Sequence, residues 1–290
     1  MTHLTRHIAL ICALFCAAPV FAQQTPVISA PDSPGRVSGV VRDTMAGQSN
    51  GFLGSAPVPP MRRFDSDMAP VVVELFTSQG CSSCPPVDAM VGALAAQPDV
   101  LPLSFHVDYW DYLGWADSFA QPEFTQRQED YARAAGERSV YTPQLILDGR
   151  DTALSMGPTQ LMGLIDAHRA APAMITVQRQ KSDGAELLDI APLSDLGGSA
   201  DVVLVRYAPE RDVTIATGEN RGKSVRYVNV VLGVQVLARW DGSQPLRLTV
   251  RPDDVSTDRF PADTRHVILI QRSVGARGLP GAILGALRLD

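Results

Sequence analysis

Two cysteines stand three residues apart in the segment Cys81-Ser82-Ser83-Cys84, between an apolar run and a segment with helical periodicity. Thiols at this spacing between a strand and a helix can form a disulfide reversibly and so exchange two electrons. The reacting species is the thiolate, and a thiol with a pKa of about 8.5 is mostly protonated at neutral pH. Unpaired N–H groups and the helix dipole favour a thiolate at a helix start. We therefore expect Cys81 to attack a partner sulfur and Cys84, one turn further in, to resolve the mixed disulfide.

Two other roles of the pair stay open on these residues. A pair of soft thiolates, with His106 as a third donor, is also a set that suits Cu(I). An inert disulfide in a partner-binding protein is the other interpretation, although a bridge between residues this close constrains the unfolded chain little. Thiol–disulfide exchange with protein or small-molecule thiols is the leading hypothesis, without a cofactor or a resident metal.

The flanking sequence predicts the elements that hold the pair. Residues 71–76 form a continuous apolar run that is typical of a buried strand. After the cysteines, one helical face carries Val87, Met90, Val91 and Leu94. A second buried strand over residues 100–107, parallel to the first, would complete a β-α-β unit.

The next part of the chain alternates helix and strand again. An insertion over residues 108–136 contains a predicted helix at 123–135, after Pro122 and before Gly136. Residues 140–147 lead into a strand, Asp148 and Gly149 predict a turn, and apolar residues at 161, 164 and 165 mark a closing helix.

A substrate groove is expected at the edge of the sheet where Cys81 lies. The candidate residues are His106, Asp108, Trp110 and Thr142. The first three follow a strand parallel to the first one, so they leave the sheet at the edge where α/β proteins bind ligands. The alternative is a core histidine with packing aromatic side chains.

The first 22 residues are typical of a secretory signal, with Arg6, an apolar run and a small residue, Ala22, before the expected cleavage point. Cleavage removes Cys12 and Cys16 and leaves the pair at 81 and 84. We expect export to the bacterial periplasm and no membrane insertion afterwards, since no later run approaches the ~18 apolar residues that a span needs. With 25 basic and 31 acidic residues, the net charge of −6 does not favour nucleic acid.

The domain organisation follows from shifts in composition. Residues 23–67 are rich in Pro, Gly and Ser and predict a flexible lead, and residues 68–171 carry the α/β pattern. Residues 172–290 predict a mostly antiparallel, sandwich-like β domain, from short β-rich runs at 174–177, 187–190, 202–207, 213–216, 225–236, 246–250 and 267–270. Residues 218–222 predict a hairpin turn.

Several motifs together resemble the DUF1223 family of exported thioredoxin-like proteins. They lie at residues 73–86, 106–111, 113–115, 125–128, 141–144, 218–222 and 229–231. The resemblance implies a thioredoxin-like domain with a helical insertion and a redox role, but it supplies no substrate. It also implies that Cys81 and Cys84 are the redox pair and that Pro143 forms a cis peptide bond beside them. Glu74 would be a buried acid that takes the proton from Cys84, since burial raises the pKa of a carboxyl group.

Overall fold

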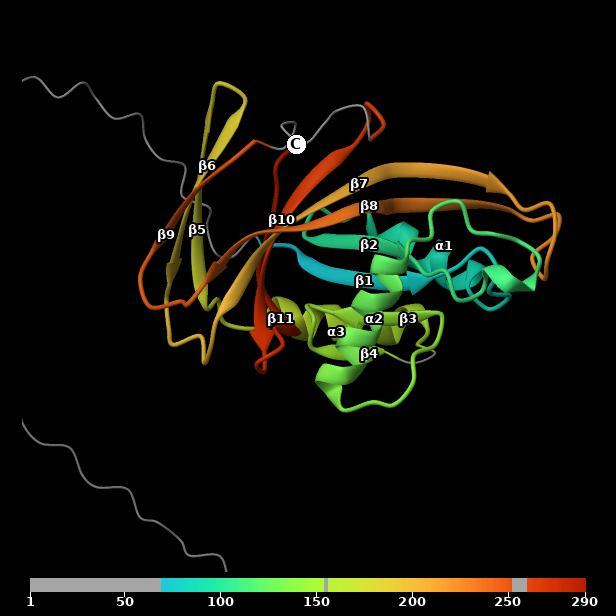
Figure 1. Cartoon of the computed structure of the whole chain (residues 1–290), viewed down its shortest axis with the longest axis horizontal. Helices are drawn as coiled ribbons and strands as arrows, with labels where there is room; N and C mark the ends of the chain where they lie inside the picture. Colours follow the sequence, from blue (N-terminus) through green and yellow to red (C-terminus); the bar gives the residue numbers. More distant parts are fainter. Residues whose placement is uncertain (1–68, 154–155, 252–259) are drawn as a thin grey trace, which may run out of the picture. The chain divides into compact units, whose positions relative to one another are not determined.

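The computed structural model describes residues 69–153, 156–251 and 260–290. An eight-stranded mixed sheet has the order β11-β10-β7-β8-β2-β1-β3-β4, and a three-stranded sheet has the order β5-β6-β9 (Figure 1). The strands before residue 172 are β1 (Val71–Thr77), β2 (Val100–His106), β3 (Gln144–Leu147) and β4 (Asp151–Ala153). The later strands are β5 (Ile175–Ser182), β6 (Ala185–Pro192), β7 (Ala200–Thr214), β8 (Ser224–Trp240), β9 (Leu246–Val250), β10 (Arg265–Val274) and β11 (Leu279–Arg288). The helices are α1 (Pro85–Leu94), α2 (Pro122–Ala135) and α3 (Pro158–Arg169). The protein is an α/β chain with a large mixed sheet and few helices.

The thiol segment joins two strands in the interior of the large sheet. Every residue of β1 and β2 is buried, and the strands pair in parallel from Val71–Val100 to Thr77–His106. Helix α1 connects them, with prolines in its first turn, where a missing N–H costs little. Strand β3 pairs antiparallel with the other edge of β1, and β4 pairs with β3. The predicted β-α-β unit is therefore present, with the turn at Asp148 and Gly149 between β3 and β4.

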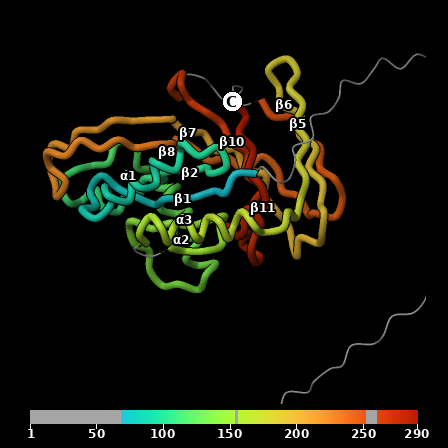
Figure 2. Tube along the Cα trace, turned by 180° about the vertical axis from the view of Figure 1, so that it is seen from behind, coloured from blue at the N-terminus to red at the C-terminus, as the bar shows by residue number. Residues whose placement is uncertain are grey.

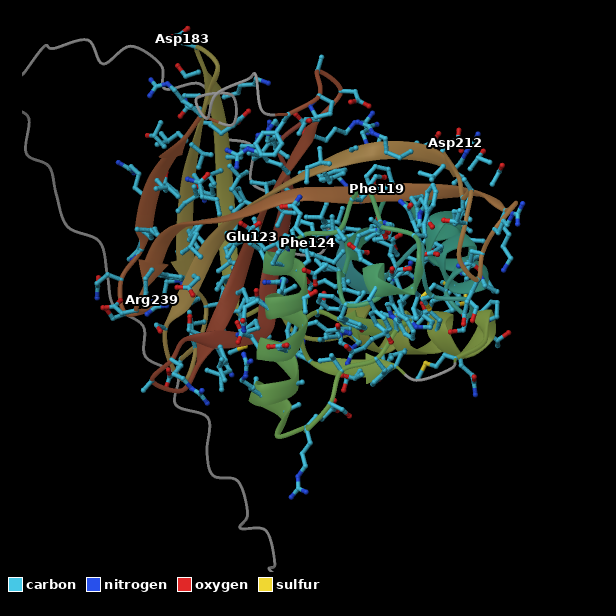
Figure 3. The ribbon with its side chains drawn as sticks, turned by 45° about the vertical axis from the view of Figure 1, so that its right-hand side comes forward. Phe119, Glu123, Phe124, Asp183, Asp212 and Arg239 are labelled. Carbon is cyan, nitrogen blue, oxygen red and sulfur yellow. A yellow bond between two sulfur atoms is a disulfide. The ribbon has the colours of Figure 1, made fainter. Side chains whose placement is uncertain are left out.

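The two faces of β1 meet different helices, because successive side chains of a strand point to opposite faces. Val73 and Leu75 belong to an apolar cluster with residues of α1 and α3. Phe76 belongs to a cluster on the other face with residues of α2. Phe124, at the start of α2 (Figure 3), packs edge-on against Phe105 of β2, with ring centroids 5.5 Å apart. This division decides which side chains can approach the thiols.

The large sheet continues across the predicted domain boundary at residues 171 and 172. β8 pairs in parallel with β2 through Ser104 and Val230. The hydroxyl of Ser104 also donates to the carbonyl oxygen of Val228 at 2.9 Å. Strands β7 and β8 form a long antiparallel hairpin, and β10 and β11 extend the sheet further. Strands from both halves of the chain thus belong to one hydrogen-bonded sheet.

Two layers of strands pack against each other in the second half of the chain (Figure 2). Ile175 of β5 and Leu188 of β6 lie in one apolar cluster with Val202 and Leu204 of β7. The alternate residue Val203 belongs to the cluster of α2. The three-stranded sheet therefore covers the face of β7 that points away from α2.

Strand β11 has no clear signal in the sequence. It contains Pro280, Gly281 and Gly285, which are unfavourable inside a strand but tolerated at an edge or a bulge. β11 is the edge strand of the large sheet, and its pairing with β10 has irregular register. The predicted turn at residues 218–222 does lie in the β7–β8 hairpin, and the short run at 213–216 is the end of β7 and the start of that turn.

The expected signal peptide at residues 1–22 and the expected lead at 23–67 lie outside the described residues. In the part of the chain that is described, no helix is long and apolar enough to cross a bilayer.

Candidate active site at the thiol turn

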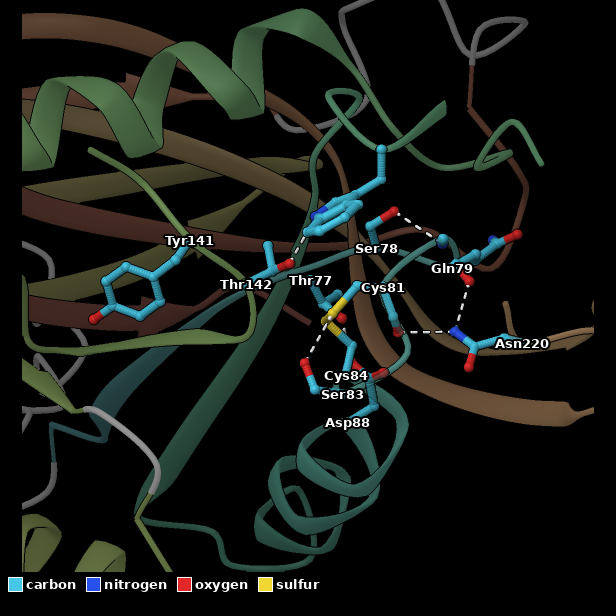
Figure 4. Close-up of a disulfide and its surroundings, with 12 residues drawn as sticks. Thr77, Ser78, Gln79, Cys81, Ser83, Cys84, Asp88, Tyr141, Thr142 and Asn220 are labelled. Carbon is cyan, nitrogen blue, oxygen red and sulfur yellow. Dashed lines mark hydrogen bonds between the residues drawn. A yellow bond between two sulfur atoms is a disulfide. The ribbon is translucent and has the colours of Figure 1, made fainter. Parts of the chain in front are cut away.

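The cysteine pair lies in the turn that connects β1 to α1. Cys81 and Cys84 form a disulfide, with their Cα atoms 5.4 Å apart. The N–H of Cys81 donates to the carbonyl oxygen of Ser78 at 3.1 Å, and the N–H of Cys84 donates to that of Cys81 at 3.3 Å. Cys84 is the N-cap of α1, and its carbonyl oxygen accepts the N–H of Asp88 at 2.9 Å. Figure 4 shows the disulfide at the start of the helix, with Ser83 and Asp88 close to Cys84.

Both cysteines are buried. Cys81 is 2% exposed and Cys84 is 0% exposed. Ser82 and Ser83 are exposed, and the Ser83 hydroxyl lies 3.5 Å from the sulfur of Cys81. The exposed serines of the turn thus adjoin the sulfur of Cys81, and the expected order of attack stays a prediction.

A buried carboxyl group lies on the same side of β1 as the disulfide. Asp88 is 4% exposed, and its Oδ1 accepts the Thr77 hydroxyl at 2.7 Å. Its Oδ2 has no hydrogen-bond partner within the described ranges. Burial raises the pKa of Asp88 from 3.8 to about 7, although the bond from Thr77 and the nearby His106 oppose the shift. Asp88 can therefore hold or release a proton near neutral pH.

A buried polar cluster adjoins Asp88. His106 Nδ1 lies 2.7 Å from Asp117 Oδ2, and both side chains are fully buried. The ring of His106 packs edge-on against Tyr227 of β8, with centroids 4.7 Å apart. Like Asp88 Oδ2, the His106 Nε2 and Tyr227 hydroxyl atoms have no partner in the part of the chain that is described. Burying a polar atom without a hydrogen-bond partner costs free energy, so these three atoms are unusual in a protein interior.

Glu74 lies on the opposite face of β1 from this cluster. It is fully buried, and its Oε1 lies 2.7 Å from Arg127 Nη2. Its Oε2 accepts the Tyr131 hydroxyl. Residues 74 and 77 are an odd number apart on one strand, so their side chains point to opposite faces. The buried carboxyl group on the face of the thiol turn is therefore that of Asp88, whereas Glu74 faces α2.

Trp110, Thr142 and Pro143 lie near the thiol turn. The indole N–H of Trp110 donates to the Thr142 hydroxyl at 2.8 Å, and Thr142 is drawn beside the disulfide in Figure 4. The peptide bond between Thr142 and Pro143 is cis. Trp110 also abuts the turn itself, because a Cβ added to Gly80 would lie 3.0 Å from the Cβ of Trp110. The insertion and the segment before β3 thus meet at the cysteines.

The other two groove candidates have contacts elsewhere. Asp108 Oδ1 accepts the Thr125 hydroxyl at 2.6 Å, which ties the insertion to the start of α2. His106 is a buried residue of the polar cluster, so the core-histidine interpretation describes its packing. Its partner Asp117 still reaches the thiol turn, because Asp117 Oδ2 accepts the N–H of Gln79 at 2.8 Å.

The sequence pattern did not single out two residues at the site. Asp88 lies four residues after Cys84, the spacing that places it on the same helical face as the N-cap. Asn220, in the β7–β8 turn, donates to the carbonyl oxygens of Gln79 and Cys81. Asn220 lies within a motif of the family resemblance, but nothing in a predicted hairpin turn indicates a contact 139 residues away.

No group of three or more His, Cys, Asp or Glu side chains is arranged to hold a metal ion among residues 69–153, 156–251 and 260–290.

The sequence matches the model of one known protein family. The family described as "Protein of unknown function (DUF1223)" matches residues 72–271, which is more than half of the chain. The chain belongs to the DUF1223 family. The match extends from β1 into β10, so it includes both the cysteine pair and the β7–β8 hairpin.

Two solved structures are similar to this DUF1223 protein. A crystal structure of a protein from Agrobacterium tumefaciens is 36% identical, covers 76% of this chain and 93% of its own, and has a TM-score of 0.63. HBP35 of Porphyromonas gingivalis has a TM-score of 0.53 at 14% identity, covering 76% of this chain and 74% of its own, and shows a likeness of fold alone. No curated protein matches the chain.

Proposed function

We propose that this DUF1223 protein is a thiol–disulfide oxidoreductase whose Cys81–Cys84 pair alternates between disulfide and dithiol. The position of the pair carries the proposal: Cys84 is the N-cap of α1, and Cys81 lies in the turn that joins the buried strand β1 to this helix. A thiolate formed there is stabilised by the helix N-terminus. A bridge across three residues would add little stability, so exchange is the better use of this spacing.

We also propose a thioredoxin-like architecture for residues 68–171, with 108–136 as its helical insertion. The strand order β4-β3-β1-β2 supports it, with β1 and β2 parallel and β3 antiparallel to both of its neighbours. Helices α1 and α3 pack on one face of β1, and α2, from the insertion, packs on the other.

The proposed exchange has two steps. A client thiolate attacks the sulfur of Cys81, the Cys81–Cys84 bond breaks, and its electron pair leaves on the sulfur of Cys84, which takes up a proton. A second client thiolate then attacks the client sulfur of the mixed disulfide and releases Cys81 as a thiolate. The client loses two electrons and the pair gains them. The reverse sequence of steps reduces a client disulfide.

Asp88 is the proposed source of the proton for Cys84. Its carboxyl group is buried near the start of α1, its Oδ2 has no partner among the described residues, and its pKa of about 7 suits transfer near neutral pH. The same group would accept the proton in the reverse direction.

Single-cysteine variants test the proposed order of attack. Reduced Cys84→Ser protein, mixed with glutathione disulfide, should form a stable mixed disulfide at Cys81, which intact-mass spectrometry detects. Reduced Cys81→Ser protein should react far more slowly, because Cys84 is fully buried. The reduced wild-type protein should instead release glutathione and recover its internal disulfide. Equal reactivity of the two variants, or none in either, would contradict the proposal.

We further propose that the exchange takes place after export, in the periplasm. The apolar run and Ala22 in the first 22 residues support this, as does the oxidising character of that compartment. N-terminal sequencing of protein recovered from a periplasmic fraction should begin at Gln23. An uncleaved N-terminus in the cytoplasm would contradict it.

A further inference from the structure

The turn of the β7–β8 hairpin packs against the thiol turn, although it follows Cys81 by more than 130 residues in the sequence. Asn220 in that turn is fully buried. Its amide Nδ2 donates to the carbonyl oxygen of Gln79 at 2.9 Å and to that of Cys81 at 2.8 Å (Figure 4). One side chain from the second half of the chain therefore binds both backbone carbonyls next to Gly80.

A neighbouring cation orients the amide of Asn220. Lys223 Nζ donates to Asn220 Oδ1 at 2.8 Å. An ammonium group can only donate, so it takes the oxygen end of the amide and leaves both N–H groups for the two carbonyls. The backbone of the hairpin turn is also closed on itself, since the N–H of Lys223 donates to the carbonyl oxygen of Asn220 at 3.0 Å.

Other contacts fix the same turn against the insertion. The Thr217 hydroxyl donates to the carbonyl oxygen of Gly114 at 2.5 Å. Gly218 has a φ of +76° and lies so close to Trp115 that an added Cβ would be 3.3 Å from the Trp115 Cβ. The indole N–H of Trp115 in turn donates to Gln79 Oε1 at 2.7 Å. The hairpin turn, the insertion and the thiol turn thus form one packed unit.

We propose that Asn220 is a positioning residue for the redox pair, holding the backbone of residues 79–81 in the conformation that keeps Cys81 within bonding reach of Cys84. This role rests on the proposed oxidoreductase function. A disulfide needs its two Cα atoms within about 7 Å, and the formation of the bond from a dithiol depends on how often the two thiols meet in that arrangement. Asn220 restrains the Cys81 side of the pair, so it favours the disulfide over the open dithiol.

The test is the disulfide–dithiol equilibrium of the mature protein in glutathione buffers, measured by thiol alkylation and a gel shift. Asn220→Ala removes the amide, and Asn220→Asp keeps its shape while it removes both donors. In each variant we expect the equilibrium to shift toward the dithiol by roughly tenfold, for the loss of two hydrogen bonds. The mixed disulfide with glutathione should also accumulate, because Cys84 then finds Cys81 less often.

Asn229→Asp is the matched control. Asn229 lies on β8, after the turn that holds Asn220, and its Nδ2 donates to the carbonyl oxygen of Pro102 on β2 at 2.8 Å. This variant loses an amide hydrogen bond between β8 and β2 without touching residues 79–81, so it should keep the wild-type equilibrium. An equal shift in Asn229→Asp would show general loosening of the sheet and would overturn the positioning role.

Lys223→Met provides a milder variant in case the Asn220 variants do not fold. Lys223 is exposed, and its removal frees the Asn220 amide to rotate. We expect a smaller shift in the same direction. Folded Asn220 or Lys223 variants with the wild-type equilibrium and the wild-type level of mixed disulfide would overturn the proposal for Asn220 alone. A wild-type protein that does not exchange with glutathione at all would overturn the oxidoreductase function itself, and the positioning role with it.

Discussion

Two buried carboxyl groups lie on opposite faces of β1. Asp88 lies beside the thiols on the face of α1, whereas Glu74 lies on the face of α2 in an ion pair with Arg127. The family resemblance implies Glu74 as the acid beside the cysteines and does not point to Asp88. Because successive side chains of a strand point to opposite faces, Glu74 faces α2, and Asp88 is the carboxyl group on the face of the thiol turn. We therefore expect different consequences when Asp88 and Glu74 are replaced.

The stability of the oxidised protein should depend on pH through Asp88. In the unfolded chain its carboxyl group deprotonates near a pKa of 3.8, but in the folded protein it does so near 7. Between these values the native state binds the extra proton, so its stability falls as pH rises, by up to about 1.4 kcal/mol per pH unit. Asp88→Asn should remove this slope. Chemical denaturation of the two proteins from pH 4 to pH 8 measures it, and parallel pH profiles would contradict the burial of a titrating Asp88.

Replacement of Glu74 should affect stability but not exchange. Glu74→Gln leaves Arg127, whose side chain is only 12% exposed, without its carboxylate partner. We expect a loss of about 1–3 kcal/mol in the free energy of unfolding, since the amide retains part of the hydrogen bonding. The rate of exchange with glutathione should remain that of the wild type. Slow exchange at unchanged stability would return Glu74 to the role that the resemblance implies.

Helix α1 and the insertion position the pair together. The apolar spacing of α1 and its prolines predict the helix, and the start and stop signals of α2 predict that element to within one residue. The packing of Trp110 against the thiol turn could not be predicted, because a turn between two buried elements gives no periodic signal. Gly80 marks the contact, since it is where a side chain would collide with Trp110.

Substitution of Gly80 should therefore be costly. In Gly80→Ala the new Cβ would lie 3.0 Å from the Trp110 Cβ and 3.4 Å from its carbonyl oxygen, so the insertion has to shift. We expect a loss of about 1–3 kcal/mol in the free energy of unfolding. Gly163→Ala is the control: this glycine is exposed within α3 with nothing within 4 Å, so the change should stabilise the protein by up to about 1 kcal/mol. Two variants of equal stability would contradict the contact.

Among the described residues, the large sheet contains strands from both sides of the boundary that composition predicts at residues 171 and 172. Runs of β-rich sequence identify most strands of the second half, but they do not reveal that β8 would pair with β2, because patterning marks buried faces and leaves the partner open. The edge strand β11, with its proline and glycines, is missed for a similar reason. The sequence does not identify Asn220 as a site residue, because its contacts with the thiol turn depend on that long-range pairing.

A shared sheet predicts that both halves unfold together. In a Trp240→Phe protein, which lacks the tryptophan of β8, the remaining Trp110 and Trp115 lie near the thiol turn, whereas the circular dichroism of the chain reports strands from both halves. In urea, the tryptophan fluorescence and the circular dichroism should change in coincident transitions. Cys81→Ser/Cys84→Ser protein should show the same coincidence, since the sheet does not depend on the disulfide. Two transitions well separated in denaturant concentration would indicate independent domains.

The reversible reduction of the Cys81–Cys84 disulfide is the central claim, and equilibration of the wild-type protein in buffers of defined glutathione to glutathione disulfide ratio tests it most directly. Alkylation of free thiols followed by a gel shift measures the fraction of dithiol. The account predicts one two-electron transition, reached from both the reduced and the oxidised starting protein at the same ratio. A disulfide that stays intact across all ratios in the folded protein, or a transition seen only on unfolding, would contradict it.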